Sequence, residues 1–200
     1  MKTPPDFEFE AAARQPVCGV DEVGRGPWAG PVMAAAVILD PQNIPAGLND
    51  SKKLTAARRA VLFEEIMASS TVAIGSASVV EIDQINILQA TFLAMRRAVE
   101  GLAVPPEFAL IDGNKIPPGL PCAAQTIVKG DARSLSIAAA SIIAKVTRDK
   151  LMCDLSATYP GYGWETNMGY GTKAHQEGLA ALGVTPHHRV SFKPIHKMLC

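Results

Sequence analysis

Short apolar runs alternate with longer segments of helical periodicity along most of this chain, and this alternation limits the fold more than any other feature. Apolar runs typical of strands cover residues 16–20, 32–39, 72–80, 108–111 and 123–128. Helical periodicity begins after Thr55 and returns over residues 83–102, 135–155 and 173–182. Strands that alternate with helices predict an α/β domain, and the last helix predicts a helical C-terminal part.

The alanine-rich segment 135–155 is the strongest helix prediction in the chain. Its apolar residues recur at helical spacing, so one face can hold Leu135, Ala139, Ile142, Val146 and Cys153. Four alanines between positions 138 and 144 give this helix a surface of small side chains. We therefore expect it to pack closely against another element.

The composition fits one folded domain with at most a small appendage. Hydrophobic residues occupy 48% of the 200 positions and charged residues only 19%, which argues against a largely disordered chain. The cysteines form no C-x-x-C pair, which favours free thiols in a reducing compartment. They are Cys18, Cys122, Cys153 and Cys200. No apolar run is long enough to span a bilayer and the first residues resemble no targeting signal, so we expect a soluble cytoplasmic protein.

Basic residues are unevenly placed, although 19 Lys and Arg balance 19 Asp and Glu. Glu177 is the last acid, and the tail beyond it carries only basic and histidine side chains. These are His187, His188, Arg189, Lys193, His196 and Lys197. A basic face suits a polyanionic partner, but a solvated terminus explains the same run equally well. The sequence leaves both interpretations open.

Three acids stand where predicted strands end, namely Asp21, Glu22 and Asp112. Adjacent side chains of a strand point to opposite faces, so Asp21 and Glu22 would share a site only at a bulge or at the end of the strand. Gly24 supports such an end. A divalent cation would offset the repulsion between the two carboxylates. A lone acid at a strand end is usually a turn residue, so spacing alone leaves a metal site as one of two interpretations.

Asp131 lies just before the alanine-rich helix, where the helix dipole favours an acid whether or not it also binds metal. Asp149 lies inside the helix, more than four turns further on, so both cannot easily reach one ion. We prefer Asp131 as a ligand. Asp149 is expected to pair with Arg148 or Lys145 instead.

Sequence motifs spread from about residue 17 to about residue 195 closely resemble those of the ribonuclease HII family, the type 2 ribonucleases H of bacteria. They read VCGVDEVGRGPWAGPV, LNDSKKL, LIDGNK, VKGDARSLSIAAASIIAKVTRDKLM, YPGYGWETNMGYGTKAH and HHRVSFKPI. The resemblance implies a ribonuclease H-like fold, with a five-stranded mixed sheet flanked by helices. It also implies an N-terminal tail (1–15), a catalytic domain (16–158) and a helical C-terminal extension (159–200) that packs on it.

The resemblance implies an active site of four carboxylates, Asp21, Glu22, Asp112 and Asp131, that binds Mg or Mn. With two ions engaged during catalysis, the enzyme would cut the RNA strand of RNA–DNA hybrids. It would also cut 5′ of ribonucleotides embedded in duplex DNA. The products would carry 3′-hydroxyl and 5′-phosphate ends. We expect this protein to act as a monomer. Its last residues show no clamp-binding motif. A silent nucleic-acid-binding module and another phosphoryl-transfer enzyme on the same scaffold are the alternatives.

The resemblance also implies the substrate contacts. Gly24, Arg25 and Gly26 would contact the ribonucleotide through backbone groups and its 2′-hydroxyl, and Tyr170 would stack on the neighbouring sugar. Taken alone, the glycines fit a plain turn and Tyr170 a packing anchor. Candidate phosphate contacts are Lys52, Lys53, Lys145, Arg148, Lys173 and His175, although each singly fits a solvated surface charge.

Overall fold

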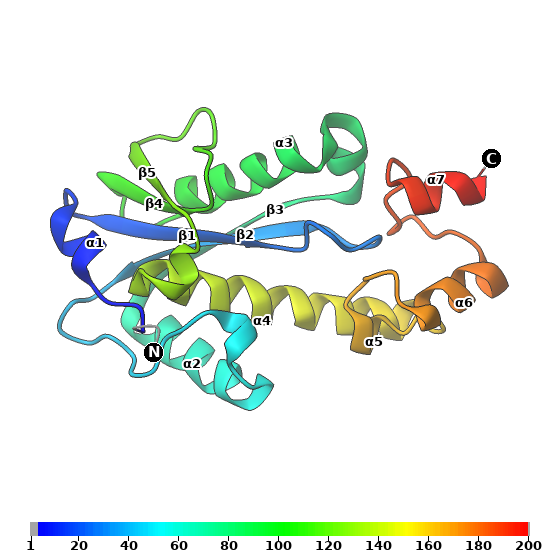
Figure 1. The fold of residues 1–200 in the computed structure, drawn as a ribbon, viewed down its shortest axis with the longest axis horizontal. Coiled ribbons are helices and arrows are strands. Elements are labelled where there is room, and N and C mark those ends of the chain that lie inside the picture. Colours follow the sequence, from blue (N-terminus) through cyan, green and yellow to red (C-terminus); the bar gives the residue numbers. More distant parts are fainter. Residues whose placement is uncertain (1–3, 200) are drawn as a thin grey trace.

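The computed structural model describes residues 4–199, and a five-stranded mixed sheet runs through its middle (Figure 1). The strands are β1 (Val17–Val23), β2 (Val32–Leu39), β3 (Ser70–Ala77), β4 (Phe108–Asp112) and β5 (Ala123–Ile127). They lie in the order β3-β2-β1-β4-β5. Strand β2 is antiparallel to β1 and β3, whereas β1, β4 and β5 run parallel. The five-stranded mixed sheet that the family resemblance implied is confirmed.

Helices cover both faces of this sheet (Figure 1). Helix α3 (Val79–Glu100) packs on one face, and α4 (Leu135–Thr158) with α2 (Ala56–Ser69) packs on the other. Strand β2 supplies both cores, because Ala34 and Ala36 join the α3 side while Ala35 and Val37 join the α4 side. The α/β class with helices on both sides is therefore confirmed.

Helix α4 packs closely against the sheet, as its alanines predicted. Ala138, Ala139, Ala140 and Ala144 are all fully buried. A Cβ atom placed on Gly19 of β1 would lie 2.2 Å from the carbonyl carbon of Ser136, so only glycine allows this approach. Cys153 is exposed rather than on the buried face, because the second half of α4 passes beyond the sheet and turns Met152 inward instead.

The segment expected as an N-terminal tail contains a short helix, α1 (Glu8–Ala12). Glu10 is fully buried, and its Oε1 accepts hydrogen bonds from Ser134 Oγ (2.5 Å), Ser136 N (2.8 Å) and Ser136 Oγ (2.7 Å). A carboxylate in this position accepts from the Ser136 N–H at the start of α4 and suits the helix dipole. The N-terminal segment thus holds the first turn of α4.

Side-chain caps fix where the other long helices begin. Thr55 Oγ1 accepts from Arg58 N (3.2 Å) and starts α2, as predicted. Ser78 and Glu81 form a capping box, so α3 starts before the predicted residue 83. Asn86 interrupts α3 with a φ of 66°, and its side chain accepts from Leu88 N and Gln89 N. Helix α3 is therefore two helical segments joined at a kink.

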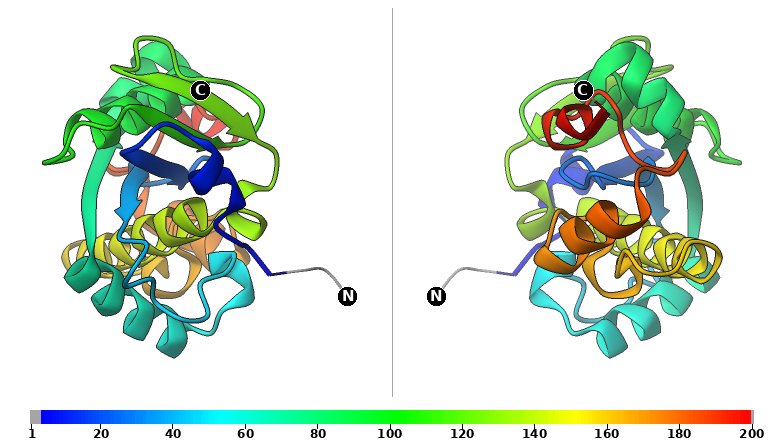
Figure 2. Two further views of the ribbon diagram at one scale, coloured as in Figure 1. Left: turned by 90° about the vertical axis from the view of Figure 1, so that its left-hand side faces the viewer. Right: turned by 90° about the vertical axis from the view of Figure 1, so that its right-hand side faces the viewer.

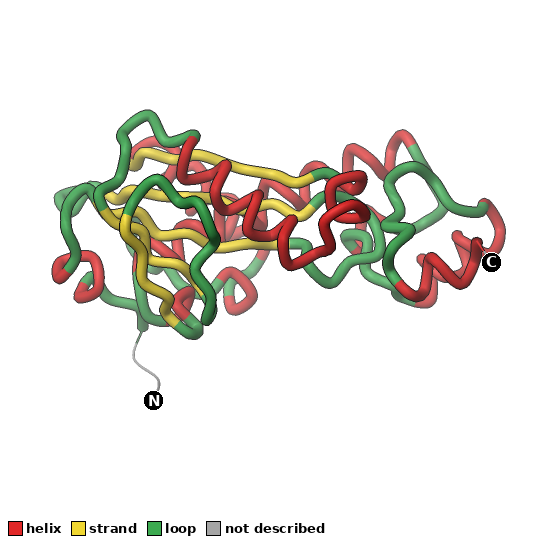
Figure 3. Tube along the Cα trace, turned by 90° about the horizontal axis from the view of Figure 1, so that it is seen from above, coloured by secondary structure: helices red, strands yellow, loops and turns green. Residues whose placement is uncertain are grey.

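The C-terminal part lies at one end of the elongated molecule and carries α5 (Trp164–Asn167), α6 (Lys173–Leu182) and α7 (Lys193–Leu199) (Figures 1 and 3). Seen from that end, α6 and α7 lie near the tip of β2 and the end of α4 (Figure 2). The predicted helical C-terminal part is confirmed. Short 3₁₀ turns, η1 (Ser51–Lys53) and η2 (Gly130–Ala132), complete the chain.

The basic tail is not a solvated terminus along its whole length. His188 is 1% exposed and Arg189 is fully buried. A bridge between Ala29 and His188 ties this segment to the loop after β1. Within residues 4–199, no helix has both the length and the apolar character needed to cross a membrane.

Candidate active site

Three carboxylates meet where the parallel strands β1 and β4 separate. Asp21 and Glu22 belong to β1, and Asp112 is the last residue of β4. Pairing between these strands ends at Val20 and Ile111, so β1 continues alone on this side. One oxygen from each of the three carboxylates lies within 4.8 Å of the others. The predicted convergence of acids at strand ends is confirmed for these three residues.

The strand itself differs from the prediction, because β1 neither ends at Asp21 nor bulges there. Its register with β2 runs without interruption through Asp21–Ala35, Glu22–Ala34 and Val23–Met33. The Asp21 carboxylate is turned along the strand instead, since its Oδ1 accepts from Glu22 N at 2.7 Å. The Asp21 side chain, which would otherwise point to the opposite face from Glu22, therefore reaches the same group of carboxylates.

Burial and mutual repulsion make this cluster unfavourable in its fully ionised form. Burial, followed by the charges of Glu22 and Asp112, holds the pKa of Asp21 well above its usual range. Burial likewise raises the pKa of Asp112, although the Gly130 N–H donates to its Oδ1 at 2.7 Å and opposes the shift. A divalent cation would remove both penalties, and carboxylate oxygens are the ligands that Mg and Mn prefer.

Asp131 is not one of the three mutually close acids, but it belongs to the same electrostatic neighbourhood. It lies in η2, and burial, Asp50 and Asp112 raise its pKa in that order. Lys52 acts in the opposite direction on both Asp112 and Asp131. Asp50 was not among the predicted ligands. Its place beside Asp131 depends on the turn η1, which no local pattern revealed.

Asp149 forms an ion pair with Lys145, with 2.8 Å between Oδ1 and Nζ, as the sequence predicted. The Lys53 side chain is half exposed, and its Nζ lies 3.9 Å from Asp50 Oδ2. The Lys173 side chain is almost fully exposed and pairs with Glu177. These lysines are placed on the surface, and their contacts with phosphate stay a prediction.

Two predicted phosphate contacts are wrong, because both side chains are buried. Arg148 is 1% exposed and donates to the carbonyl oxygens of Pro31 (3.0 Å), Met168 (2.9 Å) and Ala29 (3.0 Å). His175 is fully buried and accepts at Nε2 from Trp164 Nε1 (3.1 Å). Their spacing resembled a surface pattern, but long-range packing decides their exposure.

His175 belongs to a buried pair of neutral histidines. Thr185 N donates to His188 Nδ1 (2.9 Å), so His188 carries its proton on Nε2 and donates to His175 Nε2 (3.0 Å). The remaining nitrogen of His175 lies 3.0 Å from the Tyr170 carbonyl oxygen and donates to it. Burial first, and then the charge of His175, lowers the pKa of His188 to about 4, so the pair is neutral at pH 7.

The loop after β1 lies against the loop that holds Tyr170. Trp28 N donates to the Gly169 carbonyl oxygen (2.8 Å). A Cβ atom on Gly26 would lie 3.3 Å from Tyr170 Cε1, and the Tyr170 side chain is about half exposed. Gly24 has a φ of +90°, which favours glycine. The exposed Tyr170 ring therefore lies next to the exposed Gly26, whereas Gly24 is buried.

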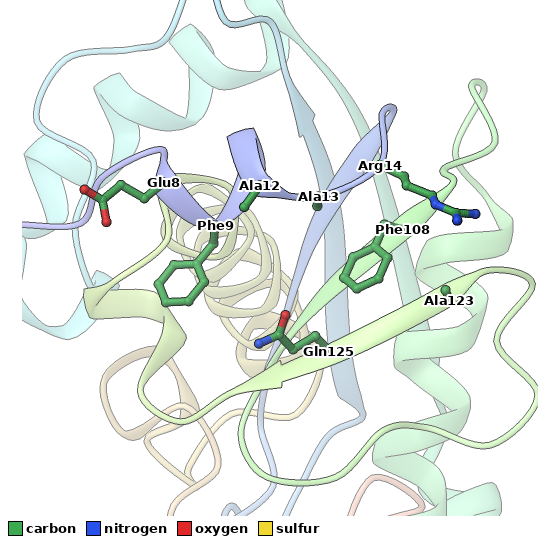
Figure 4. Close-up of a pocket in the computed structure, with 8 residues that line it drawn as sticks. All are labelled: Glu8, Phe9, Ala12, Ala13, Arg14, Phe108, Ala123 and Gln125. Carbon is green, nitrogen blue, oxygen red and sulfur yellow. The ribbon is translucent and has the colours of Figure 1, made fainter.

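A cavity of about 320 Å³ adjoins the carboxylates. Glu22 and Asp112 line it together with Arg25, Lys115 and residues of α3 such as Phe92. Another cavity, of about 670 Å³, lies between α1 and the sheet edge at β5, where Phe9, Phe108 and Gln125 line it (Figure 4). None of the acidic cluster lines this second cavity, so it is separate from the candidate site.

Comparison with known proteins gives matches over nearly the whole chain. The family model for Ribonuclease HII matches residues 18–195. The Ribonuclease HII of Jannaschia sp. is 65% identical over 98% of this chain and 98% of that protein. The Ribonuclease HII of Ruegeria pomeroyi is 61% identical over 98% of this chain and 86% of that protein.

The fold also matches solved structures. The ribonuclease H2 from Pyrococcus horikoshii OT3 has a TM-score of 0.76 and 28% identity, covering 91% of this chain and 96% of that one. Residues 18–195 of the family match include both the carboxylate cluster and the loop of Tyr170.

Proposed function

The chain belongs to the ribonuclease HII family, and on that premise we propose that it cuts 5′ of ribonucleotides embedded in duplex DNA by two-metal-ion catalysis. As a family member it is a type 2 ribonuclease H, an endoribonuclease that acts on RNA–DNA hybrids. The products of the proposed reaction carry 3′-hydroxyl and 5′-phosphate ends.

The cluster of Asp21, Glu22 and Asp112 carries this proposal. Its oxygens lie within 4.8 Å of one another, which suits ligation of Mg or Mn. Asp131 is proposed as the fourth acid, supported by its electrostatic interaction with Asp112 and Asp21. When bound, the ions would activate the attacking water and neutralise charge on the leaving oxygen. The protein contributes the interior strands β1 and β4, which hold Asp21, Glu22 and Asp112 in place.

Substrate recognition is proposed for the exposed surface beside the cluster. Backbone groups of Gly24, Arg25 and Gly26 would contact the ribonucleotide and its 2′-hydroxyl, and the half-exposed ring of Tyr170 would stack on the next sugar. Lys52, Lys53 and Lys145 would contact phosphates. The effect of Lys52 on Asp112 and Asp131 supports its place near the scissile phosphate.

The proposal also covers the domain organisation, the oligomeric state and the cellular location of the protein. Residues 16–158 would act as the catalytic domain, and residues 159–200 as an extension that helps to bind the substrate. We propose that the protein acts as a cytoplasmic monomer.

A cleavage assay on three duplexes tests the function. The substrates are an RNA–DNA hybrid, a DNA duplex with one ribonucleotide and an all-DNA duplex, each with Mn, with Mg and with EDTA. We expect cutting of the first two only, and only with metal. Asp112→Asn should lower the rate by orders of magnitude, whereas Asp154→Asn, at an exposed acid of α4, should not. Cleavage in EDTA, or equal cutting of the all-DNA duplex, would contradict the proposal.

A further inference from the structure

Arg189 is a buried cation whose contacts are not ionic. It is fully buried, and none of the ion pairs among residues 4–199 involves it. The acid that influences it, Asp83, instead accepts from Val190 N (3.2 Å) and Ser191 N (2.9 Å). Removing a guanidinium from water without a carboxylate partner is costly, so its remaining contacts must compensate.

Those contacts all go to carbonyl oxygens of the loop after β1. Arg189 Nη2 donates to Gly24 O (2.6 Å) and Gly30 O (2.7 Å), and Nη1 donates to Arg25 O (3.0 Å). Nε also donates to Gly30 O (2.9 Å). The Arg189 backbone N–H binds Trp28 O (2.8 Å), and the face of Phe192 lies 5.0 Å from the guanidinium carbon. One side chain therefore holds both ends of the loop 24–30.

This arrangement fixes the direction of two N–H groups. In a trans peptide unit the C=O and the following N–H point in opposite directions. Because the carbonyls of Gly24 and Arg25 point inward to Arg189, the N–H groups of Arg25 and Gly26 point outward. Both residues are exposed, and within residues 4–199 neither N–H forms a backbone hydrogen bond outside regular elements. A Cβ atom on Gly26 would lie 3.3 Å from Tyr170 Cε1, so the Gly26 donor belongs to a residue that lies beside this ring.

We propose that Arg189 is the positioning residue that sets the ribonucleotide preference, by holding the Arg25 and Gly26 N–H groups toward the sugar of the substrate. Arg189 does not itself touch the substrate. This inference rests on the proposed recognition of the ribonucleotide by Gly24–Gly26. It assigns to the buried C-terminal tail a function in specificity, through contacts that span 165 positions of sequence.

Binding measurements with Arg189→Lys test the proposal. Lysine keeps the charge but cannot hold three carbonyls in the fixed geometry of a guanidinium. Fluorescence anisotropy in EDTA gives Kd for a duplex with one ribonucleotide and for the matching all-DNA duplex. We expect Kd for the first to rise about tenfold, the size of one lost hydrogen bond, while Kd for the second stays within about twofold.

Two further variants separate positioning from stability. Ile66→Ala, in the core under α2, should lower Tm and leave the ratio of the two Kd values unchanged. Phe192→Leu keeps the apolar contact but removes the ring beside the guanidinium, so it should weaken the preference in the same direction and to a smaller extent. If Arg189→Lys is unfolded, Phe192→Leu alone decides the outcome.

An Arg189→Lys protein that keeps the wild-type ratio, or a folded Phe192→Leu protein that does so when Arg189→Lys is unfolded, would overturn the inference. A wild-type protein that binds both duplexes equally would instead overturn the proposed recognition of the ribonucleotide by Gly24–Gly26, so the two failures are distinguishable.

Discussion

Asp21→Asn should stabilise the metal-free protein while removing its response to metal. Asparagine keeps the Oδ1 atom that accepts from Glu22 N, so the change removes charge and little else. Asp21 has two carboxylate neighbours within 4.8 Å, and each pair of charges costs about 3 kcal/mol at an effective dielectric constant of about 20. Because burial and the neighbouring charges raise the pKa of Asp21, less repulsion is present in the wild type than this full sum, and we expect a net gain of only about 1–3 kcal/mol.

Thermal unfolding with and without metal measures this gain. For a chain of this length the gain corresponds to a rise in Tm of roughly 2–10 °C in EDTA. Manganese should then raise Tm of the wild type by mass action and have little effect on Asp21→Asn. Asp154→Asn, at an exposed position, serves as the control and should match the wild type in both buffers. If Asp21→Asn is less stable than the wild type in EDTA, or gains as much from manganese, the reasoning about the cluster fails.

Three further predictions concern stability. Glu10→Ala leaves the donors of Ser134 and Ser136 without their acceptor and should cost about 2–4 kcal/mol in urea unfolding, so a cost below about 1 kcal/mol would contradict its part in holding α4. Gly19→Ala places a Cβ atom 2.2 Å from Ser136 and should cost about 3 kcal/mol or prevent folding, and an unchanged urea midpoint would refute the close packing. The pKa of His188 falls from 6.5 to about 4 on folding, so the stability it contributes is present above pH 6.5 and is lost as pH falls toward 4, by at most about 3 kcal/mol. Urea unfolding at pH 7 and pH 4.5 should show this loss in the wild type and a smaller loss in His188→Gln.

Much of the fold could be predicted from local pattern. Alternating apolar runs and helical segments indicate the sheet and its covering helices, because the periods of strand and helix are properties of neighbouring residues. The ends of elements were less predictable. Helix α3 starts earlier than its apolar periodicity because Ser78 and Glu81 cap it, and β1 extends past Asp21 because β2 continues to pair with it.

In the candidate site, too, some residues could be predicted from the sequence and others could not. Asp21, Glu22 and Asp112 could be singled out from the sequence, because each follows an apolar run typical of a strand and the family motifs include all three. Which basic side chains are buried and which are exposed could not be predicted. Arg148 and Lys145 are three positions apart on one helix, yet Arg148 is buried among carbonyl oxygens and Lys145 pairs with Asp149 near the surface.

The sequence by itself therefore determined the class of fold, the carboxylate cluster and the family resemblance, since each depends on spacing along the chain. Only the tertiary structure decided what Glu10, Arg148, His188 and Arg189 do. Each of these polar side chains is buried, and all but one of them find partners more than 100 positions away in sequence. Whether a charge is solvated or buried depends on which distant backbone groups surround it, and no local pattern carries that information.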